Sequence, residues 1–166
     1  MTKLYHPAVK RATLHLVCGL PGAGKTTLAR RLEIELGAVR LCPDEWMEAL
    51  GVSLFDTAFR DRLEGKLTEL ARDILRQGGN AIIEFGSWSK AERGALRSLA
   101  VQCDAAVHLY WLEVRVAELA RRVRERGGAE AAALTEAFLQ GISEAVERPS
   151  DAEGLEFDHF ERIQTI

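Results

Sequence analysis

Short apolar runs alternate with longer amphipathic stretches along most of this chain. Mainly apolar runs at 14–18, 39–42, 81–85 and 105–112 have the length of buried strands, and 160–166 is a candidate for a last strand. A helical pattern follows each of the first four runs. This alternation predicts crossover connections, and therefore an α/β fold with a parallel sheet and helices on both of its faces.

Apolar positions at intervals of three and four residues predict the helices. The clearest helix runs from about Phe55 to Gly78-Gly79, and its apolar face consists of Phe59, Leu63, Leu67, Leu70 and Ile74. Further helices are predicted at 25–36 (with Gly37 as its C-terminal cap), 45–50, 90–101, 114–126 and 134–147. We find no internal repeat, and at 166 residues we expect one domain, residues 1–166.

Composition limits the partners and the cellular location. A hydrophobic share of 47% and a net charge of −3 give no global electrostatic reason to expect a nucleic acid or a membrane as main partner. Residues 1–11 lack the apolar stretch of a signal peptide, and no run approaches the ~20 apolar residues of a membrane span. Cys18, Cys42 and Cys103 have no CxxC spacing, which favours reduced core thiols in a cytoplasmic protein.

The link between the first strand and the following helix has a pattern of its own. It consists of Gly19, Leu20, Pro21, Gly22, Ala23, Gly24, Lys25, Thr26 and Thr27. The spacing Gly-x4-Gly-Lys-Thr after a strand and before a helix is that of a phosphate-binding P-loop, in which backbone N–H groups and the helix start hold anionic oxygens. We expect Lys25 to reach the β- and γ-phosphates of ATP and the Thr26 hydroxyl to ligate Mg²⁺.

Asp44 directly follows the second predicted strand, at the edge of the sheet where ligands of open α/β sheets bind. A carboxylate there can orient an attacking hydroxyl and accept its proton, as phosphoryl transfer requires. A second, compatible interpretation is that Asp44 caps the helix of residues 45–50. Trp46, Met47 and Phe55 are candidates for an acceptor pocket, although isolated apolar residues more often belong to the core.

The helix predicted at 114–126 carries a run of arginines. The side expected to pack consists of Val116, Leu119, Ala120 and Val123, and Arg121 and Arg124 lie on its far flank. Arg115, Arg122 and Arg126 form a stripe on the other flank. Guanidinium groups beside a triphosphate can neutralise developing charge, within a lid that excludes water. The alternative is a solvated face paired with Glu118 and Glu125.

These motifs together resemble the P-loop kinase superfamily, which includes chloramphenicol phosphotransferase, shikimate and gluconate kinases, zeta-toxin-like kinases and polynucleotide 5′-hydroxyl kinases. The chain is most similar to the AAA_33 group. The resemblance covers residues 13–153 and rests on the P-loop, on LCPDEWMEALGV (41–52), on EFGSWSKAER (84–93), on Arg122 and Arg126, and on Arg148-Pro149. It implies a three-layer fold with five parallel strands in the order 2-3-1-4-5 and a short helical lid.

The resemblance also implies roles for further residues. Glu84 stands where family members usually carry the aspartate of the magnesium site, so we expect Thr26 and Glu84 together at the metal. Arg93 matches a family arginine that binds phosphate or acceptor, and a salt bridge is the alternative. Gly127-Gly128 follows Arg126 in place of the usual longer insert, which shortens the lid. His15 is expected to be a core or edge residue, and no histidine has the spacing of a structural zinc site.

Two classes of function follow from these residues. The first is an ATP-dependent kinase that transfers the γ-phosphate of Mg-ATP to a hydroxyl of a small molecule of the antibiotic, sugar or nucleoside type. Its predicted catalytic residues are Lys25, Asp44, Arg122 and Arg126. The second is a nucleotide-binding switch or ATPase that acts on a protein partner. The place of Asp44 favours a kinase, and the absence of a broad basic face makes a polynucleotide 5′-hydroxyl kinase the less favoured alternative.

Overall fold

A computed structural model of the protein describes residues 11–165. Its centre is a parallel sheet of five strands in the order β2-β3-β1-β4-β5, which confirms the predicted order. The strands are β1 (Thr13–Gly19), β2 (Val39–Leu41), β3 (Ala81–Gly86), β4 (Ala106–Glu113) and β5 (His159–Gln164). The helices are α1 (Lys25–Leu36), α2 (Pro43–Ala49), α3 (Thr57–Arg76), α4 (Lys90–Gln102), α5 (Val116–Arg126), α6 (Ala129–Ala133), α7 (Glu136–Ala145) and α8 (Asp151–Gly154).

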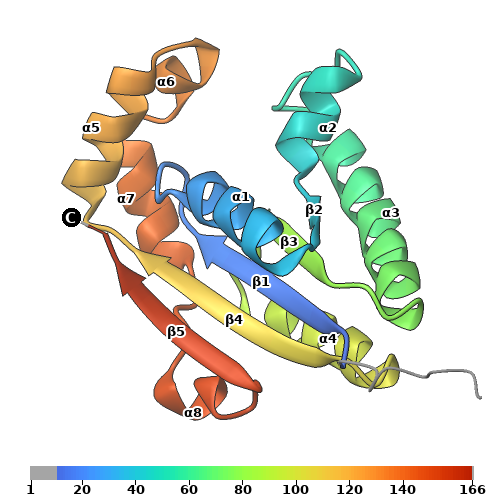
Figure 1. The fold of residues 1–166 in the computed structure, drawn as a ribbon. Coiled ribbons are helices and arrows are strands. Elements are labelled where there is room, and N and C mark those ends of the chain that lie inside the picture. The colour runs from blue at the N-terminus through green and yellow to red at the C-terminus, as the bar shows by residue number, and fades with distance from the viewer. Residues whose placement is uncertain (1–10, 166) are drawn as a thin grey trace, which may run out of the picture.

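Helices cover both faces of the sheet, so the three-layer α/β architecture is also confirmed (Figure 1). Helix α1 packs on one face against β1 and β3, whereas α3 and α4 lie side by side on the other face. Helices α5 and α7 pack together beside the carboxyl end of the sheet. Because the strands are parallel, the connections that leave this end bring distant segments together at one edge. None of the helices in residues 11–165 combines the length and the apolar character needed to cross a bilayer.

The core lies on both sides of the central strands. Every residue of β1 after Thr13 is buried, although neighbouring side chains point to opposite faces. The edge strand β5 has no fully buried residue. A strand covered by helices on both faces reads as a continuous apolar run, and this is why β1 was visible in the sequence while β5 gave a weaker signal.

Side-chain caps move two helix starts away from the predicted positions. Helix α3 begins at Thr57, two residues after the predicted start, because the Asp56 carboxylate accepts a hydrogen bond from a backbone N–H of the first turn. Thr135 caps α7 in the same way. That helix therefore begins at Glu136 instead of residue 134, and it ends at Ala145, two residues before the predicted end.

Other differences occur where elements are short. Helices α6 and α8 were not predicted, because neither is long enough to show a helical period. Strand β2 ends before Cys42, and α2 begins at Pro43, since proline is well suited to the first turn of a helix. Strand β5 covers 159–164 instead of 160–166, and residue 166 lies outside the described residues.

Candidate functional site

The segment between β1 and α1 turns at the carboxyl edge of the sheet. Gly22 has a φ of 81° and Gly24 a φ of 95°, in the left-handed region that side chains rarely adopt. A Cβ atom on Gly22 would also lie 3.1 Å from Cγ2 of Val123 in α5. Gly24 is the N-cap of α1 and supplies no side-chain cap to the first N–H groups of that helix. These backbone features are those of a concave anion site at a helix start.

Lys25 is the first residue of α1, and its side chain turns back onto this loop. Its Nζ donates a hydrogen bond to the Leu20 carbonyl oxygen at 3.0 Å. Burial lowers the pKa of Lys25, and the negative charges of Glu84 and Asp44 act in the opposite direction. The ammonium group and both carboxylates therefore belong to one electrostatic site, although they come from three separate segments.

Thr26 and Glu84, the two residues predicted to hold magnesium, are in direct contact. The Thr26 hydroxyl donates a hydrogen bond to Glu84 Oε1. The other oxygen, Oε2, accepts a hydrogen bond from Nη1 of the nearly buried Arg40 at 3.0 Å, and Arg40 also binds Glu45. A hydroxyl and a carboxylate are hard oxygen donors, which suit Mg²⁺ together with water and phosphate oxygens. The residues present therefore fit the predicted cation.

Asp44 lies in the first turn of α2, at the same edge. Cys42 is the N-cap of α2, so the interpretation of Asp44 as the cap is wrong. Arg60 of α3 donates a hydrogen bond from Nη2 to Asp44 Oδ1. The Asp44 side chain is 52% exposed, which leaves it accessible to a ligand in solution. The carboxylate is thus oriented by α3 and reachable at the edge of the sheet.

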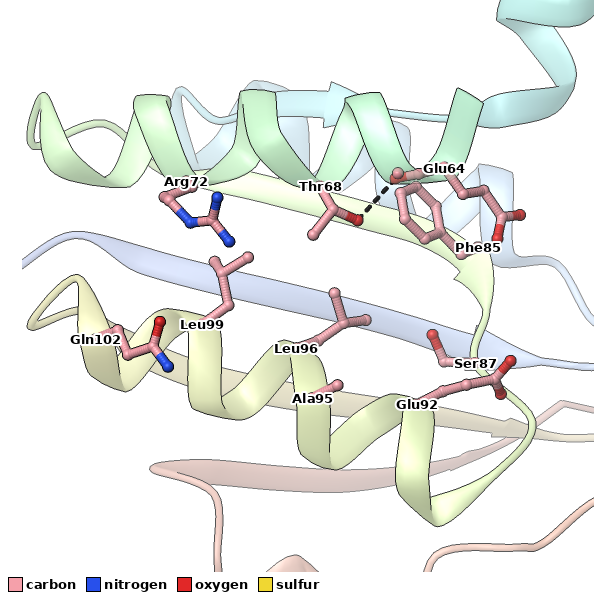
Figure 2. A pocket seen from close by; sticks show the side chains of 11 residues that line it. Glu64, Thr68, Arg72, Phe85, Ser87, Glu92, Ala95, Leu96, Leu99 and Gln102 are labelled. Carbon is pink, nitrogen blue, oxygen red and sulfur yellow. Dashed lines mark hydrogen bonds between the residues drawn. The ribbon is translucent and has the colours of Figure 1, made fainter. Parts of the chain in front are cut away.

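The three apolar residues predicted as candidates for an acceptor pocket differ in their burial. Met47 is fully buried in the core, and Trp46 and Phe55 are exposed at the surface. A pocket of about 420 Å³ lies instead between α3 and α4 (Figure 2). The sequence gave no sign of this pocket, because its walls come from two helices that touch only in the folded protein.

Helix α5 packs directly on the phosphate-binding loop. Leu119, Ala120 and Val123 are buried as predicted, and Val123 lies against Gly22. Arg115 precedes the helix as its N-cap residue. This packing places the following turns of α5 beside the loop, where a lid is expected.

Two arginines of α5, Arg121 and Arg122, are held by acidic neighbours. Arg122 donates from Nε to Glu118 at 2.6 Å and from Nη1 to the Thr165 hydroxyl at 3.4 Å. Arg121 also binds Glu118, and it binds Glu125. Hydrogen bonds from Arg121 and Arg122 lower the pKa of Glu118 to about 2. For Arg121, the pairing with Glu118 and Glu125 corresponds to the solvated-face interpretation. Arg122 is only 25% exposed, and the Glu118 carboxylate holds its side chain along the helix.

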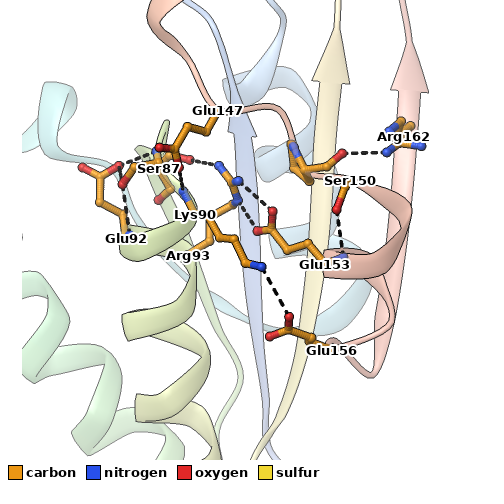
Figure 3. A network of polar contacts seen from close by, with 11 residues as sticks. Ser87, Lys90, Glu92, Arg93, Glu147, Ser150, Glu153, Glu156 and Arg162 are labelled. Atoms are coloured by element: carbon orange, nitrogen blue, oxygen red, sulfur yellow. Dashed lines mark hydrogen bonds and ion pairs between the residues drawn. The ribbon is translucent and has the colours of Figure 1, made fainter.

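Arg93 lies in the protein interior, where it forms the salt bridge of the second interpretation (Figure 3). Its Nε and Nη2 donate to the two oxygens of Glu153 at 2.7 and 2.9 Å. Its Nη1 donates to the Ser87 carbonyl oxygen at 3.0 Å, and its guanidinium lies over the Trp111 ring. Ser87 has a φ of 50°, an uncommon value for this residue type. Arg93 therefore ties the loop after β3 to α8.

Replacing Glu153 with glutamine is expected to destabilise the fold by about 1.5–3 kcal/mol, because a buried guanidinium loses a charged hydrogen-bond partner. Urea denaturation measures this change in the free energy of unfolding. Glu156→Gln is the control, since Glu156 is exposed and its ion pair with Lys90 is long, 3.7 Å. It should change stability by less than about 0.5 kcal/mol. Equal effects of the two substitutions would contradict a structural role of the Arg93–Glu153 pair.

Three histidines, His15, His108 and His159, lie near one another on the neighbouring strands β1, β4 and β5. His15 is buried in β1, as expected, and burial lowers its pKa to about 4. Its ring lies 5.0 Å from that of His108 and 6.1 Å from that of Tyr110. His6 lies outside the described residues. In the described part of the chain, no group of three or more His, Cys, Asp or Glu side chains is arranged to hold a metal.

Three residues of the site were missed by sequence reasoning. Arg40 neutralises Glu84, Arg60 orients Asp44, and Trp88 donates from Nε1 to the Gly19 carbonyl oxygen at 3.3 Å. A charged residue inside a short apolar strand was a signal that could have identified Arg40. The sequence held no such signal for Arg60, because α3 carries many charged residues and only the folded structure brings Arg60 to Asp44.

Comparisons with known proteins agree with this geometry. A family model described as an AAA domain, AAA_33, matches residues 14–149. No curated protein sequence matches the chain. Among solved structures, a proposed kinase from Chloroflexus aurantiacus is similar with a TM-score of 0.73 at 19% identity, and the match covers 93% of this chain and 89% of the other.

Two further structures are similar over most of their length. A gluconokinase from Sinorhizobium meliloti has a TM-score of 0.61 at 15% identity, covering 93% of this chain and 82% of the other. The APS kinase of Mycobacterium tuberculosis, solved with AMPPNP and APS, has a TM-score of 0.62 at 20% identity, covering 91% of this chain and 87% of the other. At these identities the likeness establishes the fold.

Proposed function

The chain belongs to the AAA_33 family, and from that premise we propose that it is an ATP-dependent kinase that phosphorylates a hydroxyl of a small molecule. The observation that carries the proposal is that Glu84 contacts Thr26, next to Lys25 at the phosphate-binding loop, and that the charge of Asp44 acts on Lys25 as well. A cation for the phosphates, a carboxylate for a metal and a carboxylate for an attacking hydroxyl are the parts that phosphoryl transfer requires. The fold shared with a gluconokinase and an APS kinase supports the same reaction class.

In the proposed reaction, the loop amides and Lys25 hold the β- and γ-phosphates of ATP. Thr26 and Glu84 would hold Mg²⁺, which supplies neutralisation of phosphate charge when it is bound. Asp44 orients the acceptor hydroxyl and takes up its proton as the oxygen bonds to the γ-phosphorus and the bond to ADP breaks. Arg122 and Arg126 neutralise charge on the group in transfer.

The alternative function is a nucleotide-dependent switch or ATPase that acts on a protein partner. Such a protein needs the loop, Lys25 and the metal site, but it has no use for a carboxylate directed to an acceptor. Asp44 is accessible and is oriented by Arg60, and this supports the kinase over the switch. Arg40 neutralises Glu84, and this is equally useful to a kinase and to a switch, so Arg40 does not help to distinguish the two functions.

The test of the proposed function is ADP release measured across a panel of hydroxyl compounds. The panel contains sugars, amino sugars, nucleosides, hydroxyl-bearing antibiotics and 5′-hydroxyl oligonucleotides, and mass spectrometry identifies phosphorylated products. We expect at least one small molecule to raise ADP release above the rate with water alone and to yield a phosphate ester. If no compound is phosphorylated while ATP is hydrolysed at an unchanged rate, the switch becomes the better assignment.

Arg122→Ala is expected to lower kcat about 10- to 100-fold with little change in ATP affinity, since a hydrogen bond to a charged group contributes about 1.5–3 kcal/mol. Steady-state kinetics with the identified acceptor and calorimetric titration of ATP separate the two effects. Arg124→Ala is the matched control, because Arg124 lies on the same helix in an exposed position. Equal activity of both variants and the wild type would assign Arg122 to the solvated face.

A further inference from the structure

The pocket between α3 and α4 lies next to the candidate acceptor carboxylate. Arg60 binds Asp44 through Nη2, and its Nη1 lies 3.7 Å from Glu64 Oε1, so one guanidinium connects Asp44 to the pocket wall. Ser87, which directly follows β3, lines the pocket at the same end. This end of the pocket therefore lies by the carboxyl end of β3, the edge of the sheet where the phosphate-binding loop also lies.

The volume and the lining of this pocket suit a small polar ligand. Its volume of about 420 Å³ lies within the range of small-molecule sites, about 300–1,000 Å³. Phe85, Leu96 and Leu99 supply an apolar floor. Hydroxyl, amide and charged groups stand around that floor, which is the combination that fixes the orientation of a bound molecule.

Charge is distributed unevenly along the pocket (Figure 2). Glu64 of α3 and Glu92 of α4 face each other at the end near Ser87, whereas Arg72 and Gln102 lie at the opposite end. The carboxylates thus stand at the end next to Asp44. An anionic ligand group would meet repulsion there, whereas a cationic group could pair with Glu64. Glu92 adds negative charge at this end, although its Oε2 already accepts hydrogen bonds from the Ser89 backbone N–H and hydroxyl at the start of α4.

Burial strongly affects the pKa of Glu64. It raises the pKa of Glu64 to about 7, while Arg60 lowers it and the like charges of Asp61 and Glu92 raise it. Burial makes the ionised form of Glu64 costly in the empty pocket. A bound cation would stabilise that ionised form. This electrostatic effect supports a ligand of positive charge at that end.

We propose that the pocket between α3 and α4 binds the phosphate acceptor, and that this acceptor is an amine-bearing alcohol whose ammonium group pairs with Glu64. The inference rests on the proposed kinase function and narrows its acceptor class from hydroxyl compounds in general to amino sugars, aminocyclitols and related amino alcohols. Acceptors with a phosphate near the reacting hydroxyl, which include nucleic-acid ends, are excluded by the same carboxylates.

The experiment uses amino sugars, aminocyclitols and linear amino alcohols, each beside its N-acetyl derivative, together with neutral and carboxylated sugars. ADP release, product mass and calorimetric binding without ATP are measured for the wild type and Glu64→Gln. Glu69→Gln is the control, because Glu69 lies on the same helix but is exposed and paired with Lys66. We expect N-acetylation and Glu64→Gln each to weaken acceptor binding at least about tenfold, with kcat and ATP affinity nearly unchanged.

The pH dependence gives a second readout. Glu64 is ionised above its pKa of about 7 and protonated below it, so a permanently charged amine should bind more tightly as the pH rises through 7. Glu64→Gln should remove this dependence, and Glu69→Gln should keep it. A flat profile in the wild type would contradict the pairing of Glu64 with the amine.

The outcomes separate this inference from the proposed function. Phosphorylation of a neutral or anionic acceptor, with no effect of Glu64→Gln on its KM, keeps the kinase and overturns the amine pocket. Amines that bind in a Glu64-dependent way without being phosphorylated show an amine site at Glu64 but overturn its assignment as the acceptor site, and the kinase is then decided by the other compounds of the panel. If no compound of the panel binds or reacts, the inference is overturned as well.

Discussion

Replacing Lys25 with alanine is expected to lower the rate of phosphoryl transfer by on the order of 10²–10³-fold and to weaken the binding of Mg-ATP. The ammonium group lies partly buried at the loop, and in such surroundings it stabilises phosphate charge more than an exposed lysine would. Calorimetric titration of ATP and single-turnover kinetics measure the two effects.

The fold is expected to tolerate this change. Burial lowers the pKa of Lys25, so the charged form is held at a cost in the absence of nucleotide. Lys25→Met keeps most of the side-chain volume without that charge and should be at least as stable as the wild type by urea denaturation. Lys66→Ala, at an exposed position of α3, is the activity control. Unchanged ATP affinity and turnover in both Lys25 variants would contradict the phosphate-binding role of the loop.

The lowered pKa of Lys25 also predicts how ATP binding depends on pH. Because the pKa of Lys25 in the free protein lies below its usual value, the ammonium loses its proton at a lower pH than an exposed lysine does. ATP affinity should therefore begin to fall at a lower pH than the ordinary pKa of a lysine would give. This fall should disappear in Lys25→Met.

Asp44→Asn is expected to abolish most acceptor phosphorylation, by about 10²–10⁴-fold, while ATP affinity holds. The amide is nearly isosteric but cannot take up the proton of the hydroxyl. Because Cys42 and not Asp44 is the N-cap of α2, the substitution removes no cap, and it loses only an exposed ion pair with Arg60, worth about 0–1 kcal/mol. The loss of acceptor phosphorylation should therefore result from the missing proton acceptor and not from a destabilised fold.

Rates of ADP release with and without the identified acceptor measure this effect. Glu48→Gln, another exposed carboxylate of α2, is the matched control and should behave as the wild type. If Asp44→Asn retains full transfer to the acceptor, Asp44 is not the proton acceptor. If the wild type responds to no acceptor and Asp44→Asn hydrolyses ATP equally fast, the switch-type function is favoured.

Local patterns in the sequence determined the architecture. The continuous apolar run of β1, the glycines of the loop and the three-to-four spacing in α3 each depend on neighbouring residues, and the elements they predict are present. The buried face of α3 differs in part from the predicted one, because Leu70 is exposed while Ala71 and Leu75 are buried. The strand order came from the resemblance to P-loop kinases and is confirmed. Elements too short for a period, such as α6 and α8, left no trace.

Only the tertiary structure decided the partners of the charged residues. Arg93 meets Glu153 across 60 residues of sequence, Arg40 meets Glu84 across 44, and Arg60 meets Asp44 across 16. Every arginine in the sequence had several acidic residues as possible partners. The choice among them depends on which helices pack side by side, and that is set by the burial of apolar faces and not by the charges themselves.

The pocket between α3 and α4 shows the same division. The sequence located the loop for the phosphates, because backbone conformation is encoded in consecutive residues. It did not locate the space between α3 and α4, where Glu64 and Glu92 face each other. A pocket is the volume left between packed elements, so it exists only once the sheet has fixed the distance between the two helices.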